Sequence, residues 1–193
     1  MGGRVKVSDE RFYDFKERLV WSAGFLDEGI EHILLERIPG CSGVVRSTEQ
    51  EDRSGTDYWA ERAGLPSLSV DVKVRSEDFI LRGHDDLALE TWSVVNQKVG
   101  WTRDAKKRTD FILWFWKETG RFFLVSFPAL CKVFEVYWQL WSARYKTAPQ
   151  SSGTWESECV FVPRSVVVEK LEAWREGRFV APAPLPEQPA LLP

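Results

Sequence analysis

The sequence predicts an α/β domain of the α+β kind, in which a central mixed β-sheet is flanked by helices. Three observations lead to this prediction. Apolar residues recur at helical spacing over 8–37 and again over 129–145, whereas the pattern between 43 and 127 is that of strands. The stretch DFILWFWK, residues 110–117, is apolar on both strand faces. Such a strand must be covered on both sides, and a helix on each face would supply the cover.

The first expected element is one long helix, or two joined helices, over residues 8–37. Ser8 or Asp9 can cap its start, and the sequence PGCSG ends it. Its other face is acidic, and it could lend a carboxylate to a neighbouring site. The apolar residues that recur at helical spacing are Phe12, Phe15, Leu19, Leu26, Ile30, Ile33 and Leu34.

A series of strands follows, separated by segments rich in glycine, proline and charged residues. We expect most of these strands to pair antiparallel. The expected strands are 43–48, 56–62, 67–75, 87–95, 110–117 and 121–127.

The last part of the chain predicts a helix over 129–145, a strand over 157–165 and a short helix over 165–176. The helix over 129–145 carries many aromatic residues at helical spacing, which favours a role in the core over a base-stacking surface. Residues 180–193 are rich in proline and predict a disordered or extended tail. We therefore expect one domain, residues 1–179, followed by this tail.

Composition restricts the function classes. No apolar run approaches the roughly 20 residues of a membrane-spanning helix, and the N-terminus lacks the apolar segment of a signal peptide, so we expect a cytoplasmic protein. The chain has 2 histidines and 3 cysteines, too few and too scattered for a zinc site. If a metal binds, carboxylates must hold it. The net charge of −3 argues against binding nucleic acid over the whole surface and leaves local binding open.

Acidic and basic residues interrupt the central expected strand. In LSVDVKV, residues 68–74, apolar and polar residues alternate strictly, which places Asp71 and Lys73 on one face. Asp57 begins the preceding strand, and a hairpin turning at 63–66 would bring it near Asp71. Two neighbouring carboxylates repel unless a cation neutralises them, and magnesium suits such a site. The alternative is a polar strand face braced by an internal bond between Asp71 and Lys73.

Asp57 followed by Asp71-Val72-Lys73, after an N-terminal helix, resembles the motif of the PD-(D/E)XK nuclease superfamily, with its restriction-endonuclease-like α-β-β-β-α-β core. The surrounding phrases are similar to those of small nuclease-like proteins of phages and mobile elements. The resemblance implies that Asp57, Asp71 and the main-chain carbonyl of Val72 bind Mg²⁺ or Mn²⁺. It also implies that Lys73 positions or activates the attacking water and stabilises charge on the phosphate. The first motif reads Thr56-Asp57 and not Pro-Asp, and the proline is often absent in the family.

Further residues could assist this site. Glu90 would add a carboxylate if the strand register places it opposite Asp71, although a slip of one residue would turn it away. Family members often recruit an acidic residue from the first helix, and Glu31 is the preferred candidate over Glu17 and Glu28. Gln97 could orient water or contact phosphate, with a plain surface glutamine as the alternative.

The resemblance implies a magnesium-dependent nuclease that hydrolyses phosphodiester bonds of DNA without strict sequence specificity. The alternative is a nuclease scaffold with a disused site that binds or inhibits a host protein, through the proline-rich tail or an aromatic surface. A third hypothesis is a homodimeric resolvase of DNA junctions. The residues expected to contact DNA phosphates are Arg75, Arg103, Lys106, Lys107 and Arg108, and the alternative for the last four is a solvated loop.

Overall fold

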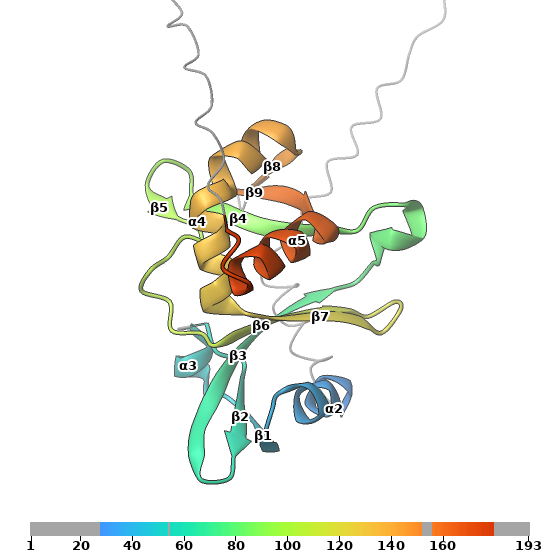
Figure 1. Ribbon diagram of the computed structural model, residues 1–193, viewed down its shortest axis with the longest axis vertical. Helices are drawn as coiled ribbons and strands as arrows, with labels where there is room; N and C mark the ends of the chain where they lie inside the picture. The colour runs from blue at the N-terminus through green and yellow to red at the C-terminus, as the bar shows by residue number, and fades with distance from the viewer. Residues whose placement is uncertain (1–27, 54, 152–155, 180–193) are drawn as a thin grey trace, which may run out of the picture.

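The computed structural model describes residues 28–53, 55–151 and 156–179, and within them the strands form two sheets (Figure 1). The first sheet has the strand order β1 (Cys41–Arg46), β2 (Tyr58–Arg62), β3 (Leu65–Arg75), β6 (Phe111–Trp116) and β7 (Arg121–Ser126). The second has the order β5 (Lys98–Val99), β4 (Asp86–Val94), β9 (Glu156–Pro163) and β8 (Thr147–Ser151). The helices are α2 (Glu28–Arg37), α3 (Glu49–Arg53), α4 (Phe127–Arg144) and α5 (Arg164–Arg175), with a 3₁₀ turn, η1 (Phe79–Arg82).

The first sheet is mixed, as the sequence predicts. Its β3 and β6 run parallel, and its other neighbouring strands run antiparallel. A tight turn joins β2 to β3, and Gly64 takes the left-handed conformation there with φ of 71°. The antiparallel meander β1-β2-β3 therefore brings the start of β2 beside the middle of β3.

The expectation of one sheet is wrong, because β4 leaves the first sheet and pairs with β9. The two partners are about 70 residues apart along the chain, and the local alternation of apolar residues does not determine which strand is the neighbour. Together with β5 and β8 they form an antiparallel second sheet.

Both faces of β6 are covered, as its sequence predicts. Leu113 packs with the α2 residues Ile30 and Leu34 on one face of the first sheet. On the opposite face, Ile112 and Trp114 join a cluster that also contains residues of α4, α5, β4 and β9. Figure 1 shows α2 at one side of the first sheet and α4 and α5 at the other. We expected helices alone to cover the two faces of β6, but side chains of the second sheet also cover one of them.

The aromatic face of α4 forms the core, which confirms that part of the prediction. Phe134, Tyr137 and Trp141 are buried, and the Tyr137 and Trp141 rings stack with centroids 5.6 Å apart. Pro128 lies in the first turn, where its missing N–H costs no helical hydrogen bond. The helix therefore stabilises the fold by burying large rings between the two sheets.

A network of ion pairs connects η1 with both sheets. Asp78 is 2% exposed and accepts hydrogen bonds from Arg121 at 2.7 and 3.0 Å and from Thr119 at 2.5 Å. Arg121 also pairs with Asp85, directly before β4, and Asp85 pairs with Arg164 at the start of α5. The hydrogen bonds from Arg121 are the main cause that lowers the pKa of Asp78 to about 2.

The remaining expected elements agree to within about two residues with β1, β2, β3, β4, β6, β7, β9, α4 and α5. The helix expected over 8–37 is observed as α2 over its last ten residues, and its earlier part lies outside the described residues, as does the tail 180–193. The short elements α3, η1, β5 and β8 were not predicted. Among the helices of the described ranges, none combines the length and the apolar character needed to cross a membrane.

Candidate functional site

Asp57 and Asp71 come together where β2 begins beside the middle of β3. The main-chain N–H of Asp57 donates to the carbonyl of Val70 at 2.8 Å, which sets Asp57 opposite Asp71 across the two strands. The Asp57 Oδ2 atom accepts a 2.5 Å hydrogen bond from the N–H of Val72. The hairpin predicted from the sequence is confirmed, and it brings the two carboxylates to neighbouring positions.

The side chain of Asp71 is almost wholly buried and holds two ammonium groups. Lys73 lies 2.8 Å from Oδ1, and Lys107 lies 2.5 Å from Oδ2. The exposed fractions of the three side chains are 3% for Asp71, 10% for Lys107 and 28% for Lys73. The cluster therefore contacts solvent mainly through Lys73. The internal bond between Asp71 and Lys73, which was the alternative considered from the sequence, is present.

Burial and the neighbouring charges shift the pKa values of both carboxyl groups in this cluster. Burial raises the pKa of Asp57 to about 7, and the charge of Asp71 adds to the rise, while the Val72 N–H and Lys73 oppose it. Burial also acts to raise the pKa of Asp71, but Lys73 and Lys107 more than offset it and hold that pKa below its usual range. At neutral pH Asp71 is therefore a carboxylate.

Lys73 remains a cation at neutral pH. Burial acts to lower its pKa, but the ion pair with Asp71 outweighs burial and raises the pKa above its ordinary value. Arg75, half-buried two residues further along β3, acts in the lowering direction. Because Lys73 is charged, it can donate a hydrogen bond to an anion or to water but cannot accept a proton.

An aromatic ring from a distant loop covers the two lysines. The Trp101 ring centroid lies 5.4 Å from the Lys73 ammonium and 5.8 Å from that of Lys107, and the Phe127 ring lies 5.6 Å from the latter. These distances are within the range of cation–π attraction. Trp101 is therefore a residue of this site that the sequence did not reveal, since 28 positions separate it from Lys73.

Glu90 does not lie opposite Asp71, and that expectation is wrong. The strand that carries it, β4, pairs with β9 and β5 and not with β3. The Glu90 carboxylate accepts 2.8 Å hydrogen bonds from the Ser93 hydroxyl and from the N–H of Trp101. Glu90 thus acts on the site indirectly, by fixing the backbone of the residue that covers the lysines.

Neither auxiliary candidate lies at the cluster. Glu31 is exposed on α2, and α2 packs on the face of the first sheet opposite to Asp71. Gln97 is exposed in the turn between β4 and β5, as expected for a surface glutamine. Glu17 lies outside the described residues.

The basic residues of the loop between β5 and β6 lie in different environments. Lys106 and Arg108 are exposed, whereas Lys107 reaches inward to Asp71. Arg103 lies between two tryptophan rings, 4.7 Å from Trp92 and 4.0 Å from Trp138. The loop therefore offers two exposed cations, together with a buried one that the sequence alone assigned to the surface.

Comparison of the chain with protein-family models, with curated proteins and with solved structures gives no match.

The donors at the cluster are those that a magnesium ion accepts. Asp57 and Asp71 supply carboxylate oxygens, which are hard ligands. The Val72 carbonyl is a ligand only by the resemblance, and the contact that Val72 makes here is the hydrogen bond from its N–H to Asp57. In the described residues there is no group of three or more His, Cys, Asp or Glu side chains that could hold a metal ion. An ion at Asp57 and Asp71 would thus depend on water and substrate oxygens for its remaining ligands, as is common for magnesium.

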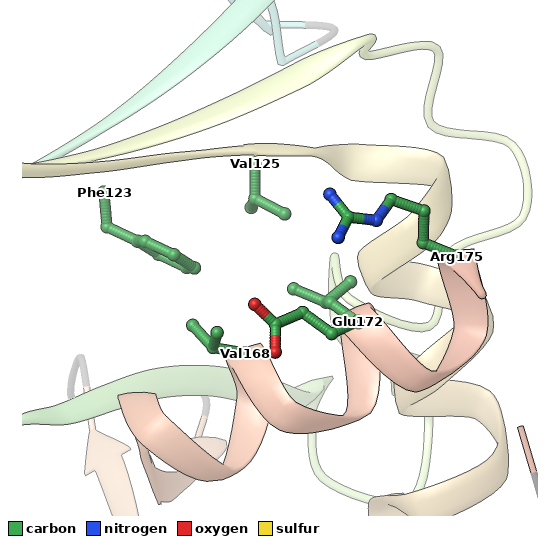
Figure 2. Close-up of a pocket in the computed structure, with 6 residues that line it drawn as sticks. Phe123, Val125, Val168, Glu172 and Arg175 are labelled. Atoms are coloured by element: carbon green, nitrogen blue, oxygen red, sulfur yellow. The ribbon is translucent and has the colours of Figure 1, made fainter. Parts of the chain in front are cut away.

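A separate hollow of about 160 Å³ lies between β7 and α5. Figure 2 shows Phe123 and Val125 of β7 facing Val168, Glu172 and Arg175 of α5. The hollow has an apolar floor and contains none of the residues of the carboxylate cluster. It is therefore distinct from the candidate site.

Proposed function

We propose that the protein is a magnesium-dependent nuclease that hydrolyses phosphodiester bonds of DNA without strict sequence specificity. The observation that carries the proposal is the meeting of Asp57, Asp71 and Lys73 at one place on two neighbouring strands. This is the arrangement that the resemblance to the PD-(D/E)XK superfamily implies. The order helix, three-stranded meander and then a strand parallel to β3 also supports a restriction-endonuclease-like core.

One feature of the chain departs from that core. Between β3 and its parallel neighbour β6, the superfamily pattern has a helix, whereas this chain has η1, β4 and β5. A parallel connection needs a crossover of a dozen or more residues, and these elements provide it. The departure changes what covers the site, because the loop after β5 carries Trp101 and Lys107 to it.

The proposed chemistry follows from the charges. Asp57, Asp71 and the Val72 carbonyl would hold the ion, which when bound supplies a positive charge that stabilises the developing charge on the phosphate. The Lys73 ammonium, charged and 28% exposed, would donate hydrogen bonds to a phosphate oxygen or to the attacking water. Lys106 and Arg108, exposed on the neighbouring loop, would bind backbone phosphates and so carry no sequence information.

Nuclease assays on supercoiled plasmid and on linear DNA, with Mg²⁺ and with EDTA, test the proposal. The wild-type protein should cleave with Mg²⁺ alone, and Lys73→Met should lower the rate by about 100-fold or more, because a donor to the phosphate is lost. Asp86→Asn, which removes an exposed carboxylate at the start of β4, is the control and should cleave at the wild-type rate. Equal cleavage by wild type and Lys73→Met would refute the proposal.

A second candidate function is binding to another protein by a nuclease-like scaffold that no longer catalyses, and the ion pairs of Asp71 favour it. Both oxygens of Asp71 already hold an ammonium group, as in a scaffold whose site is no longer used. Phe79, Ile80 and Leu81 of η1 are 49%, 38% and 65% exposed and would suit a protein-binding surface. Calorimetric titration with Mg²⁺ separates the two functions, since a disused site that retains these pairs should release no heat of binding.

A further inference from the structure

Lys107 occupies the position of a counter-cation inside the candidate site. Its ammonium group lies 2.5 Å from Asp71 Oδ2 although the two residues are 36 positions apart. Lys73 holds the other oxygen of the same carboxylate at 2.8 Å. The two lysines balance the charges that Asp57 and Asp71 carry when both are ionised. A divalent cation added to this cluster would meet two ammonium groups and would be repelled by both.

The backbone near Asp57 leaves room for the Lys107 ammonium. Gly55 has φ of 93°, a conformation that residues with a side chain rarely adopt, and a Cβ atom built there would lie 2.5 Å from Lys107 Nζ. The Gly55 carbonyl accepts a 2.9 Å hydrogen bond from the Thr109 hydroxyl. The missing side chain of Gly55 therefore leaves a small recess for the ammonium end of Lys107. The hydrogen bond from Thr109, two residues after Lys107, fixes the loop to Gly55.

The loop that carries Lys107 is held at both ends by contacts that do not involve Lys107. At its start, Glu90 accepts from the Trp101 N–H, and Arg103 donates to the Thr91 carbonyl at 3.1 Å. At its end, the Asp110 carboxylate accepts from both the N–H and the hydroxyl of Ser69, at 2.8 Å each. The four-carbon side chain of Lys107 can therefore leave Asp71 while the loop keeps its place.

From these contacts we infer that Lys107 is a built-in competitor of the divalent cation. It holds Asp71 Oδ2 in the metal-free protein, and an ion binds there when the side chain swings out of the Gly55 recess. The inference rests on the proposed function, because it requires that Asp57 and Asp71 bind an ion. It adds a control on that binding: metal affinity is set by the cost of displacing one ammonium group.

Amine acetylation of the wild-type protein tests the exchange without any substitution. The full chain, free of DNA, is treated with acetic anhydride in EDTA or in Mn²⁺ or Mg²⁺ at concentrations that calorimetry shows to saturate. Peptide mass spectrometry then measures each lysine. Labelling of Lys107 should rise several-fold with the ion, whereas the exposed neighbour Lys106 should react equally in both conditions. Unchanged labelling of Lys107 at saturating metal would overturn the inference.

Calorimetry on Lys107→Met gives the second test, with Lys106→Met as the matched control. Without the competing charge, Lys107→Met should bind Mn²⁺ about tenfold more tightly than wild type, and Lys106→Met should bind with wild-type affinity. Urea denaturation establishes that each variant is folded. If Lys107→Met is unfolded, the labelling of the wild-type chain decides.

The outcomes separate the inference from the proposed function. If wild type binds the ion and cleaves DNA but Lys107→Met binds no more tightly, the inference is wrong and the nuclease proposal stands. If Lys107→Met gains affinity while wild type does not cleave DNA, the inference stands and the nuclease proposal fails. If neither protein binds an ion, both are wrong.

Discussion

At the scale of single residues, Asp71 determines the chemistry of the cluster. Its side chain is 3% exposed and is the shared partner of two ammonium groups, so removing its charge leaves the buried Lys107 and the partly exposed Lys73 without their common counter-charge. At Asp57, in contrast, burial has already raised the pKa of the carboxyl group to about 7, so a substitution there removes a group that is only partly ionised at neutral pH. The two carboxylates look equivalent in the sequence but differ in their charge state at neutral pH.

Asp71→Asn should lower the free energy of unfolding by about 3 kcal/mol, because breaking a buried ion pair on one side costs more than an exposed pair contributes. It should also abolish metal binding. Urea denaturation monitored by tryptophan fluorescence measures the first effect and calorimetry the second. Asp86→Asn removes the same charge at an exposed position and should change the stability by less than about 0.5 kcal/mol. Equal stability of the two variants would contradict this account of Asp71.

The sequence predicts the positions of Asp57, Asp71 and Lys73 well, because the alternation along one strand and one hairpin turn determine them. It does not predict the partner of Lys107. That contact depends on where a loop of about ten residues folds back, and no periodic pattern describes such a loop. The same reason explains why Trp101 was missed.

At the scale of elements, the strands follow from periodicity but their pairing does not. Glu90 shows the difference, since its strand was placed correctly along the chain and then assigned to the wrong neighbour. The alternation of apolar residues indicates which face of a strand is buried, but it does not determine which other strand pairs with it. The consequence for the site is that β4 supplies an anchor for Trp101 and not a third carboxylate.

The ion pairs of Asp78 should make stability depend on pH. Its pKa is about 2 in the folded protein and about 3.9 when unfolded, so its contribution of about 2 kcal/mol is present above pH 4 and is lost as the pH falls toward 2. Asp78→Asn should therefore be less stable than wild type at pH 7, and the difference should close near pH 2. Urea denaturation across this range measures it.

The matched control is Glu77→Gln, the neighbour whose pair with Arg82 is exposed on both sides. It should cost at most about 0.5 kcal/mol at any pH. A constant difference between Asp78→Asn and wild type from pH 7 to pH 2 would refute the assignment.

The loop between β5 and β6 should become more mobile when Arg103, which anchors it against two tryptophan rings, is replaced. Arg103 lies between the rings of Trp92 and Trp138, and such contacts contribute about 1 to 2 kcal/mol when they are partly desolvated. In Arg103→Ala, amide hydrogen exchange should accelerate over residues 101–109 and stay at the wild-type rate in β3. Arg108→Ala, which removes an exposed cation from the same loop, is the control. Equal exchange in both variants would show that Arg103 does not anchor the loop.

At the scale of the whole molecule, the net charge of −3 requires that any binding of DNA be local. The exposed cations near the site, Lys106 and Arg108, are few, so few counterions should be released. The loop connects β5 of the second sheet to β6 of the first (Figure 1), and its Lys107 contacts Asp71. The fold thus places two exposed cations, Lys106 and Arg108, on the loop whose Lys107 contacts Asp71.

We expect the affinity for duplex DNA, measured in Ca²⁺ by fluorescence anisotropy, to fall with salt with a logarithmic slope of about −2 to −4. Replacing both Lys106 and Arg108 by alanine should weaken binding and make that slope shallower by about 2. Exchanging Arg46 and Arg62 of β1 and β2 for alanine provides a control with the same change of net charge. An equal effect of both double variants would contradict a local binding surface.

The central claim is that Asp57 and Asp71 converge on a divalent cation, and a crystal soaked in Mn²⁺ tests it most directly. The account predicts an anomalous difference peak about 2.1 Å from a carboxylate oxygen of each residue, with the Lys107 side chain turned away from Asp71. A map at saturating Mn²⁺ without that peak, with Lys107 still on Asp71, would contradict it.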